Sequence, residues 1–147
     1  MKRRLTIIFI WTLLQSCTES GPIDINSIQI VRTNQHPIFV DHERKLVTVD
    51  KNGKTIDELD LYPDTGDGCD SYLFDSGSKF VLVDCNGHWF GIEKKTGELK
   101  SEGWKWNEKL PDIHLGKFIQ SDGEVNYLFS SVTDFELTEV YRHKDPR

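Results

Sequence analysis

The stretch YLFDSGSKFVLVDCNG, residues 72–87, decides the fold because it repeats an earlier stretch, IFVDHERKLVTVDKNG, residues 38–53. The two copies align without a gap at an offset of 34 residues, and seven of their 16 positions are identical. Each copy has apolar runs on either side of a polar segment, near residues 42–44 or 76–78, and ends on Val-x-Val-Asp-x-Asn-Gly. The pattern predicts two strands joined by a turn, then an Asn-Gly turn into a third strand.

The Asn-Gly dipeptide gives the predicted turns a physical reason. Both residue types tolerate positive φ, which the two central positions of the tightest hairpin turns require. We therefore expect Asn52-Gly53 and Asn86-Gly87 to occupy such positions.

The remainder of the chain from residue 28 follows the same pattern of short apolar runs divided by Gly, Asn and Asp. Residues 117–130 look like a weak third copy of the repeat. Because short strands with regular turn signals are typical of all-β folds, we expect one β-rich domain over residues 28–147. Its antiparallel meanders would form a small sandwich or a strongly twisted sheet.

The repeated meanders resemble the blades of β-propeller proteins over roughly residues 38–130. A closed propeller needs at least four blades of four strands, which is more than this chain holds. The resemblance therefore implies blade-like hairpin repeats as the unit of the fold, without a closed propeller.

The first 17 residues have the layout of a secretory signal. Three basic residues, Lys2 to Arg4, precede the apolar run Leu5–Leu14, and Leu14-Gln15-Ser16-Cys17 ends the segment. These last four residues resemble the lipobox of bacterial lipoproteins. The resemblance implies that residues 1–16 are a signal peptide removed by cleavage and that Cys17 is lipidated, with residues 17–27 as a tether. The protein would then lie in the cell envelope, exported and anchored to a membrane by its acyl chains, palmitate among them.

Two other interpretations of this segment remain open, namely an uncleaved anchor and an ordinary cleaved signal. A membrane-spanning helix needs about 20 apolar residues. The run Leu5–Leu14 is half that length.

The charge of the chain narrows the possible partners. The full chain has a net charge of −6, and loss of the basic signal segment would leave −9 on the mature domain. An acidic surface repels phosphate backbones, so we expect no nucleic-acid partner. An envelope protein or a glycan is the better expectation.

The cysteine count agrees with export. Lipidation of Cys17 would leave Cys69 and Cys85 as a pair, and a disulfide between them would contribute about 3 kcal/mol by closing a short loop. The alternatives are two free thiols and a metal pair, and the sequence has no Cys-x-x-Cys motif that would favour metal.

Three carboxylates, Asp64, Asp67 and Asp70, lie with two glycines in one loop. Oxygen-rich, glycine-containing loops bind Ca²⁺, so these residues are a weak calcium candidate. The spacing is not that of an EF-hand, and a solvated turn is the alternative. We expect no metal and no cofactor for the chain as a whole.

The tryptophans Trp89, Trp104 and Trp106 are the candidate binding residues, since exposed aromatic rings stack on sugars and partner chains. They are equally suited to a core. Alternation along residues 88–92 places Trp89 on one face with Gly91, and His88 on the other.

The sequence contains no nucleophile motif, no HExxH pair and no phosphate-binding glycine loop. We therefore expect a binding module that recognises an envelope protein or a glycan and has no enzymatic activity. The alternative function is inhibition of an exported enzyme, with the acidic loop 64–70 inserted into a basic cleft.

Overall fold

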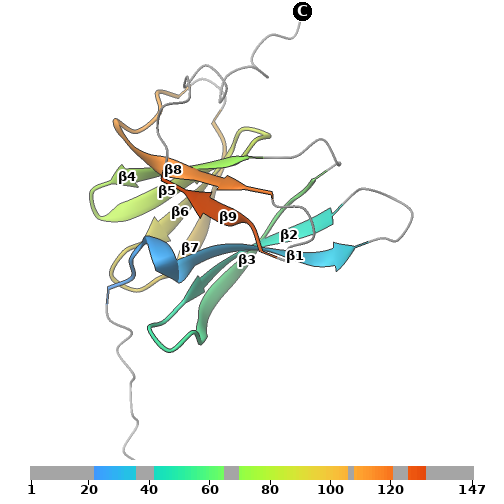
Figure 1. Cartoon of the computed structure of the whole chain (residues 1–147). Coiled ribbons are helices and arrows are strands. Elements are labelled where there is room, and N and C mark those ends of the chain that lie inside the picture. Colours follow the sequence, from blue (N-terminus) through green and yellow to red (C-terminus); the bar gives the residue numbers. More distant parts are fainter. Residues whose placement is uncertain (1–21, 36–41, 65–69, 106–107, 121–125, 132–147) are drawn as a thin grey trace, which may run out of the picture.

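The computed structural model describes residues 22–35, 42–64, 70–105, 108–120 and 126–131. About two thirds of them belong to antiparallel β-strands (Figure 1) and none to an α-helix, which confirms the prediction of an all-β fold built from meanders. The elements are a single 3-10 turn, η1 (Ile25–Ser27), and the strands β1 (Ile28–Gln35), β2 (His42–Val49), β3 (Thr55–Asp64), β4 (Ser71–Ser76), β5 (Lys79–Val83), β6 (His88–Glu93), β7 (Leu99–Trp104), β8 (Ile113–Ile119) and β9 (Leu128–Ser130).

The strands form two sheets that pack face to face. One sheet has the order β1-β2-β3, and the other has the order β7-β6-β5-β4-β8-β9. Figure 1 shows the six-stranded sheet above the three-stranded sheet. Apolar side chains from both sheets meet in one inner core, which includes Ile30, Leu46, Leu82 and Phe90. The structure is therefore a two-sheet sandwich, one of the two arrangements that the sequence predicts.

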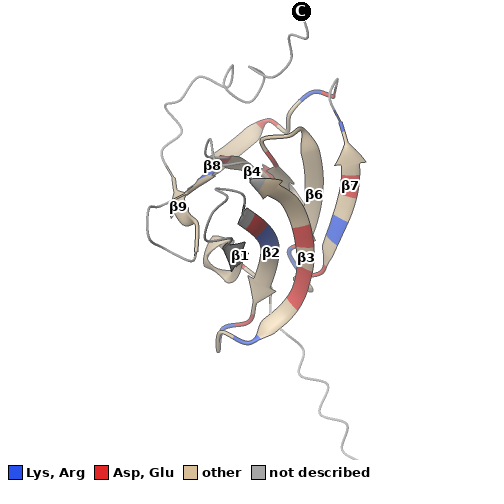
Figure 2. Cartoon of the chain, turned by 90° about the vertical axis from the view of Figure 1, so that its right-hand side faces the viewer, with Lys and Arg blue, Asp and Glu red and all other residues tan. Residues whose placement is uncertain are grey.

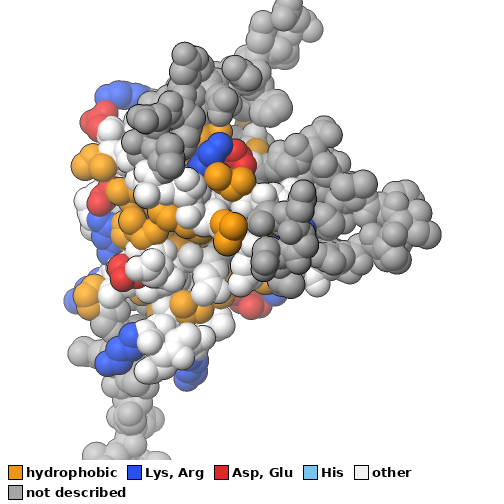
Figure 3. Space-filling model, in the orientation of Figure 1, with side chains coloured by type: hydrophobic (Ala, Val, Ile, Leu, Met, Phe, Trp, Pro, Cys, Tyr) orange, Lys and Arg blue, Asp and Glu red, His pale blue; other side chains and the backbone are white. Residues whose placement is uncertain are grey.

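The inner core approaches the surface on one side of the molecule. Figure 3 shows apolar side chains gathered across the middle of the face that is turned to the viewer in Figure 1. Residues packed against this core are only partly buried, namely Ile25, Ile56, Leu59, Leu99, Leu115 and Phe129.

Alternation in the central strands β5 and β6 divides the apolar residues between two faces. Phe80 and Leu82 on β5 point into the inner core, whereas Val81 and Val83 belong to a second cluster on the outer face of the six-stranded sheet. Leu110, from the segment before β8, belongs to the same outer cluster. Both faces of these strands are thus buried, which explains why their sequences are continuous apolar runs.

The two copies of the repeat have matching turns. In the first, the Asp50 amide donates to the Lys54 carbonyl at 2.8 Å and the Gly53 amide donates to the Asp50 carbonyl at 2.9 Å. In the second, Asp84 takes the place of Asp50, with corresponding bonds of 2.9 Å to His88 and from Gly87.

The expected conformation of these turns is wrong in one respect. Only the glycines, Gly53 and Gly87, have positive φ, and no non-glycine residue among the described ones does. The connection is therefore a longer turn that needs one left-handed residue, so Asn52 and Asn86 keep ordinary backbone angles.

The predicted start of the domain also needs correction. Residues 22–27 were expected to belong to a tether, but Ile23 is buried in the inner core and its amide donates to the Lys94 carbonyl at 2.8 Å. Asp24 then caps η1 by accepting a hydrogen bond from the Ser27 amide. The two isoleucines Ile23 and Ile25 supply the apolar surface that holds this segment on the domain.

One buried ion pair joins the two sheets. Arg44 on β2 donates to both carboxylate oxygens of Asp84, at 3.1 and 2.9 Å, and both side chains have 0 % exposure. Arg44 also donates twice to the Tyr62 carbonyl, at 3.0 and 2.8 Å, and the Ser71 hydroxyl donates to Asp84 at 2.7 Å. This network ties β2 and β3 to the β5–β6 turn and to the start of β4.

We predict that Asp84→Ala lowers the free energy of unfolding by about 3–5 kcal/mol, because it leaves the buried Arg44 guanidinium without its counter-charge. Urea unfolding measures this loss. The repeat provides a matched control, Asp50→Ala, since the Asp50 carboxylate accepts only from nearby amides in its own exposed turn. The control should cost about 1 kcal/mol. Equal losses for the two variants would contradict the role assigned to the ion pair.

Candidate functional site

Three aromatic side chains from three strands lie near one another at one end of the sandwich. They are Tyr62 near the end of β3, His88 at the start of β6 and Trp104 at the end of β7, and together they are called the aromatic surface below. Tyr62 is 50 % exposed and Trp104 is 60 % exposed. Large rings in such an open position are available to a ligand.

Strand pairing and one tilted ring contact bring the three side chains together. His88 and Trp104 are directly opposite each other across β6 and β7, which places their side chains on the same face of the sheet. The Tyr62 and His88 ring centroids are 4.1 Å apart with an interplanar angle of 33°. His88 therefore lies between the two exposed rings.

Hydrogen bonds orient the aromatic surface. The Trp104 indole Nε1 donates to the Asn86 carbonyl at 3.2 Å, and the His88 amide donates to the Asn86 side-chain oxygen, also at 3.2 Å. The Tyr62 carbonyl accepts both hydrogen bonds from Arg44. The β5–β6 turn and the buried ion pair thus position all three rings.

The structure places only one of the three predicted tryptophans on this surface. Trp104 is exposed as expected for a binding residue, whereas Trp106 lies outside the described residues. Trp89 is 6 % exposed and belongs to the outer apolar cluster, so its assignment to a partner surface is wrong. The physical reason is that its face of β6 is covered, and the Lys105 ammonium lies over its ring at 5.0 Å from the centroid.

Sequence reasoning missed Tyr62 and His88. The sequence around Tyr62 does not indicate a binding residue. Tyr62 becomes part of the surface only through its contact with His88, which lies on the other sheet. The pairing of His88 with Trp104 could have been found by aligning β6 and β7 as a hairpin, with one bulge allowed.

The acidic loop is described only in part. Of the calcium candidates, Asp70 accepts a hydrogen bond from Lys117 Nζ at 2.6 Å, while Asp67 and the side chain of Asp64 lie outside the described residues. Within the described ranges, the structure contains no cluster of three or more His, Cys, Asp or Glu that could hold a metal ion.

The cysteines are also described in part. Cys85 is disulfide-bonded. Cys69, its predicted partner, and Cys17, the predicted lipidation site, lie outside the described residues.

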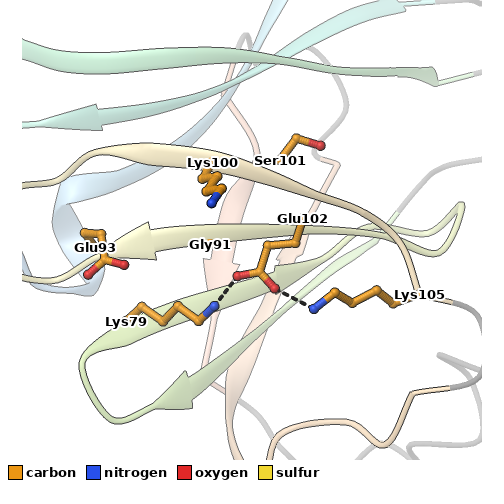
Figure 4. Close-up of a pocket in the computed structure, with 7 residues that line it drawn as sticks. All are labelled: Lys79, Gly91, Glu93, Lys100, Ser101, Glu102 and Lys105. Atoms are coloured by element: carbon orange, nitrogen blue, oxygen red, sulfur yellow. Dashed lines mark hydrogen bonds and ion pairs between the residues drawn. The ribbon is translucent and has the colours of Figure 1, made fainter.

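A pocket lies on the outer face of β5, β6 and β7, and it is called the charged pocket below. Its volume is about 460 Å³. Figure 4 shows the residues that line it, on the three strands and the segment after β7, and among them the side chains of Lys79, Glu102 and Lys105 point toward one another. The lining residues are Lys79, Gly91, Glu93, Lys100, Ser101, Glu102 and Lys105.

Glu102 is the centre of the charged pocket. Its carboxylate accepts a hydrogen bond from Lys79 and another, at 2.8 Å, from Lys105, and its side chain is only 12 % exposed. Burial raises the pKa of Glu102, but the hydrogen bonds from Lys105 and Lys79 outweigh this effect and hold the pKa below its ordinary value of 4.5.

Gly91 makes room for this carboxylate. A Cβ atom at Gly91 would lie 2.7 Å from Glu102 Oε1, which is closer than real Cβ contacts allow. A residue without a side chain is therefore needed on β6 for Glu102 to lie flat across the sheet.

Charged residues follow the exposed edges near both sites. Figure 2 shows acidic positions along β3 and both signs of charge on β7. Because β7 is an edge strand of the six-stranded sheet, these charges also discourage unwanted pairing with other chains.

Comparison with known proteins identified no matching family model, no similar curated protein and no similar solved structure. Within the part of the chain that the structure describes, no helix is long and apolar enough to cross a membrane.

We predict that Glu102→Gln makes the free energy of unfolding less dependent on pH at acidic pH. The folded-state pKa of Glu102 lies below its unfolded value, so its contribution is fully present above 4.5 and is lost as the pH falls through the lower folded-state pKa. The wild-type chain should thus lose more unfolding free energy than E102Q when urea titrations are repeated from neutral to acidic pH. Glu98→Gln, at an exposed glutamate, should keep the wild-type profile. Identical profiles for wild type and E102Q would contradict this assignment.

Proposed function

We propose that this protein is an exported, lipid-anchored binding module of the cell envelope that recognises a glycan through the aromatic surface, without catalysis. The observation that carries the proposal is the exposure of Tyr62 and Trp104 on either side of His88.

The geometry of the rings favours a sugar. The apolar C–H face of a pyranose ring stacks on an aromatic side chain, and its hydroxyl groups need polar partners nearby. The aromatic surface offers both, since exposed rings adjoin the Asn86 carbonyl and the His88 imidazole. The three rings are held by strand pairing and hydrogen bonds, so little freedom is lost when a ligand binds.

The size of the surface favours a glycan over a protein. A stable protein interface covers about 800 Å² on each partner around an apolar centre. Among the described residues, the exposed large hydrophobic side chains are Tyr62, Trp104, Ile113 and Leu128, and only the first two belong to this surface. Two rings match the footprint of one or two sugar units.

Two observations support export. The first 17 residues combine a basic start, an apolar run and a lipobox-like ending, and the resemblance to bacterial lipoproteins rests on them. Cys85 is disulfide-bonded, and disulfides persist mainly in oxidising compartments outside the cytosol.

We predict that the purified protein binds insoluble cell-wall glycan in a pull-down assay and that Trp104→Ala weakens the binding about tenfold, through loss of the stacking ring. Tyr62→Ala should weaken it as well. Ile113→Ala is the matched control, since Ile113 is 58 % exposed but lies outside the aromatic surface.

Retention of full binding by both W104A and Y62A would contradict the proposed surface. Binding of an envelope protein in place of glycan, lost in the same two variants, would reassign the ligand class.

We predict that intact-mass analysis of the membrane fraction yields residues 17–147 plus lipid. Cys17→Ser should abolish the lipid mass and release the protein from the membrane, because the thiol that carries the anchor is gone. A soluble, unlipidated species that retains residues 1–16 would contradict export and anchoring.

A further inference from the structure

We propose that the lipid anchor holds the domain upright on the membrane, with the aromatic surface at the far end, where it faces a glycan polymer and not a membrane glycolipid. This inference rests on the proposed function, because it takes the anchor at Cys17 and the aromatic surface from it. It adds the direction in which the surface faces, and with it the kind of glycan that the surface can reach.

The chain enters the domain at a point that is fixed to both sheets. Ile23 is buried in the inner core, and its amide donates to the Lys94 carbonyl at 2.8 Å. The Lys94 amide donates in turn to the Ser78 carbonyl at 3.2 Å, in the β4–β5 turn. The Thr48 hydroxyl of β2 donates to the Gly97 carbonyl at 2.6 Å, in the β6–β7 turn. Ile23 therefore cannot move independently of the sandwich.

This end of the sandwich is called the base below. It comprises residues 22–24 and the turns at residues 50–54, 75–79 and 93–98.

The base is opposite the aromatic surface. Each of β3, β6 and β7 has one end at the base and its other end at the aromatic surface, as can be followed in Figure 1. Six positions separate His88 from Lys94, which corresponds to about 20 Å at the rise of an antiparallel strand. The aromatic surface thus lies a full strand length from the point at which the chain enters the domain.

The connection from the base to the anchor is short. Residues 18–22 separate Cys17 from Ile23, so these two residues lie at most about 20 Å apart even when the chain is fully extended. If the aromatic surface rested on the lipid, Ile23 would lie about 20 Å above it, at the limit of that reach. The base, in contrast, can rest on the membrane without any stretching of the connection.

The charge distribution opposes a sideways orientation. Cleavage would leave a net charge of −9 on the mature domain, but the base is neutral, because its three turns and Asp24 contain five lysines and five acidic residues. The side of the domain at β3 has exposed carboxylates at Glu58 and Asp60, which share the single lysine Lys45 (Figure 2). An anionic lipid surface repels this side and tolerates the base.

The height of the aromatic surface selects the class of glycan. A sugar attached to a membrane lipid lies at the level of the headgroups, about 20 Å below the exposed rings of Tyr62 and Trp104 in the upright domain. A polymer that extends away from the membrane has sugar units at the level of these rings. The upright orientation therefore favours wall polymer over lipid-linked sugar.

The test measures distances from the membrane by paramagnetic relaxation in NMR. The lipidated, ¹⁵N-labelled protein is inserted into lipid nanodiscs that contain a gadolinium-chelating lipid. The repeat supplies two matched reporters, namely the amide of Gly53 at the base and the amide of Gly87 in the turn before His88. The enhancement should be at least about tenfold larger at Gly53, because it falls with the sixth power of distance and about 20 Å separates the two ends.

Variants identify the cause of the orientation. Insertion of about 20 Gly-Ser residues after Gly21 should lower both enhancements and reduce their ratio, because the longer connection no longer limits the orientation. The same insertion after Arg147 is the matched control and should leave the ratio unchanged. Cys17→Ser should remove the enhancement at both glycines, since the anchor is lost.

A second measurement tests the class of glycan. A soluble fragment of wall glycan should shift the Trp104 indole signal of the anchored protein, whereas a glycolipid carried in the same nanodisc should not. A shift caused by the glycolipid would overturn the inference, as would equal enhancements at Gly53 and Gly87 or an unchanged ratio after the insertion at Gly21.

Failure of the proposed function gives different results. If the wild type shows no enhancement at either glycine, the anchor is refuted, and this inference with it. If the enhancement is much larger at Gly53 but neither sugar shifts the Trp104 signal, glycan binding is refuted while the upright orientation stands.

Discussion

The buried ion pair between Arg44 and Asp84 is the constraint on which the arrangement of the two sheets depends. Removing two charges from water is costly, and the cost is offset only when every donor and acceptor has a partner. The Arg44 guanidinium meets this condition by bonding to Asp84 and to the Tyr62 carbonyl, and Asp84 meets it with the Ser71 hydroxyl. Sliding one sheet against the other would separate these groups, whereas apolar contacts alone would tolerate such a shift. The ion pair thus selects one relative position of the sheets.

The aromatic surface is a consequence of that position. Asp84 begins the β5–β6 turn, and its amide donates to the His88 carbonyl at 2.9 Å, so the residue that fixes the sheets also places the central ring. Arg44 holds the backbone at Tyr62, on the opposite sheet. The ring contact between Tyr62 and His88 therefore depends on a contact in the core and not on local sequence.

The repeat shows how far the sequence could predict this structure. The matching sequences of the two copies form matching turns at Asp50 and Asp84. The alternation of side chains along β6 correctly placed Trp89 and His88 on opposite faces of the sheet. The two aspartates nevertheless have different roles, because only Asp84 has an arginine facing it, 40 positions away in the chain. Strand patterns follow from local residue types, so they were predictable. The ion pair, the Tyr62–His88 contact and the position of Glu102 over Gly91 depend on the pairing of distant segments, which a single sequence does not encode in any local pattern.

One bulge explains how β7 serves both candidate sites. Residues two apart on a regular strand share a face, so Glu102 and Trp104 would point the same way. The register shifts between Trp89 and Phe90, however, and Gly103 has a φ of 79°, a conformation that L side chains rarely adopt. The extra residue turns Trp104 toward His88 and leaves Glu102 over Gly91 on the opposite face. The charged pocket and the aromatic surface are consequently adjacent in sequence but separated by the thickness of the sheet, which makes them two independent sites.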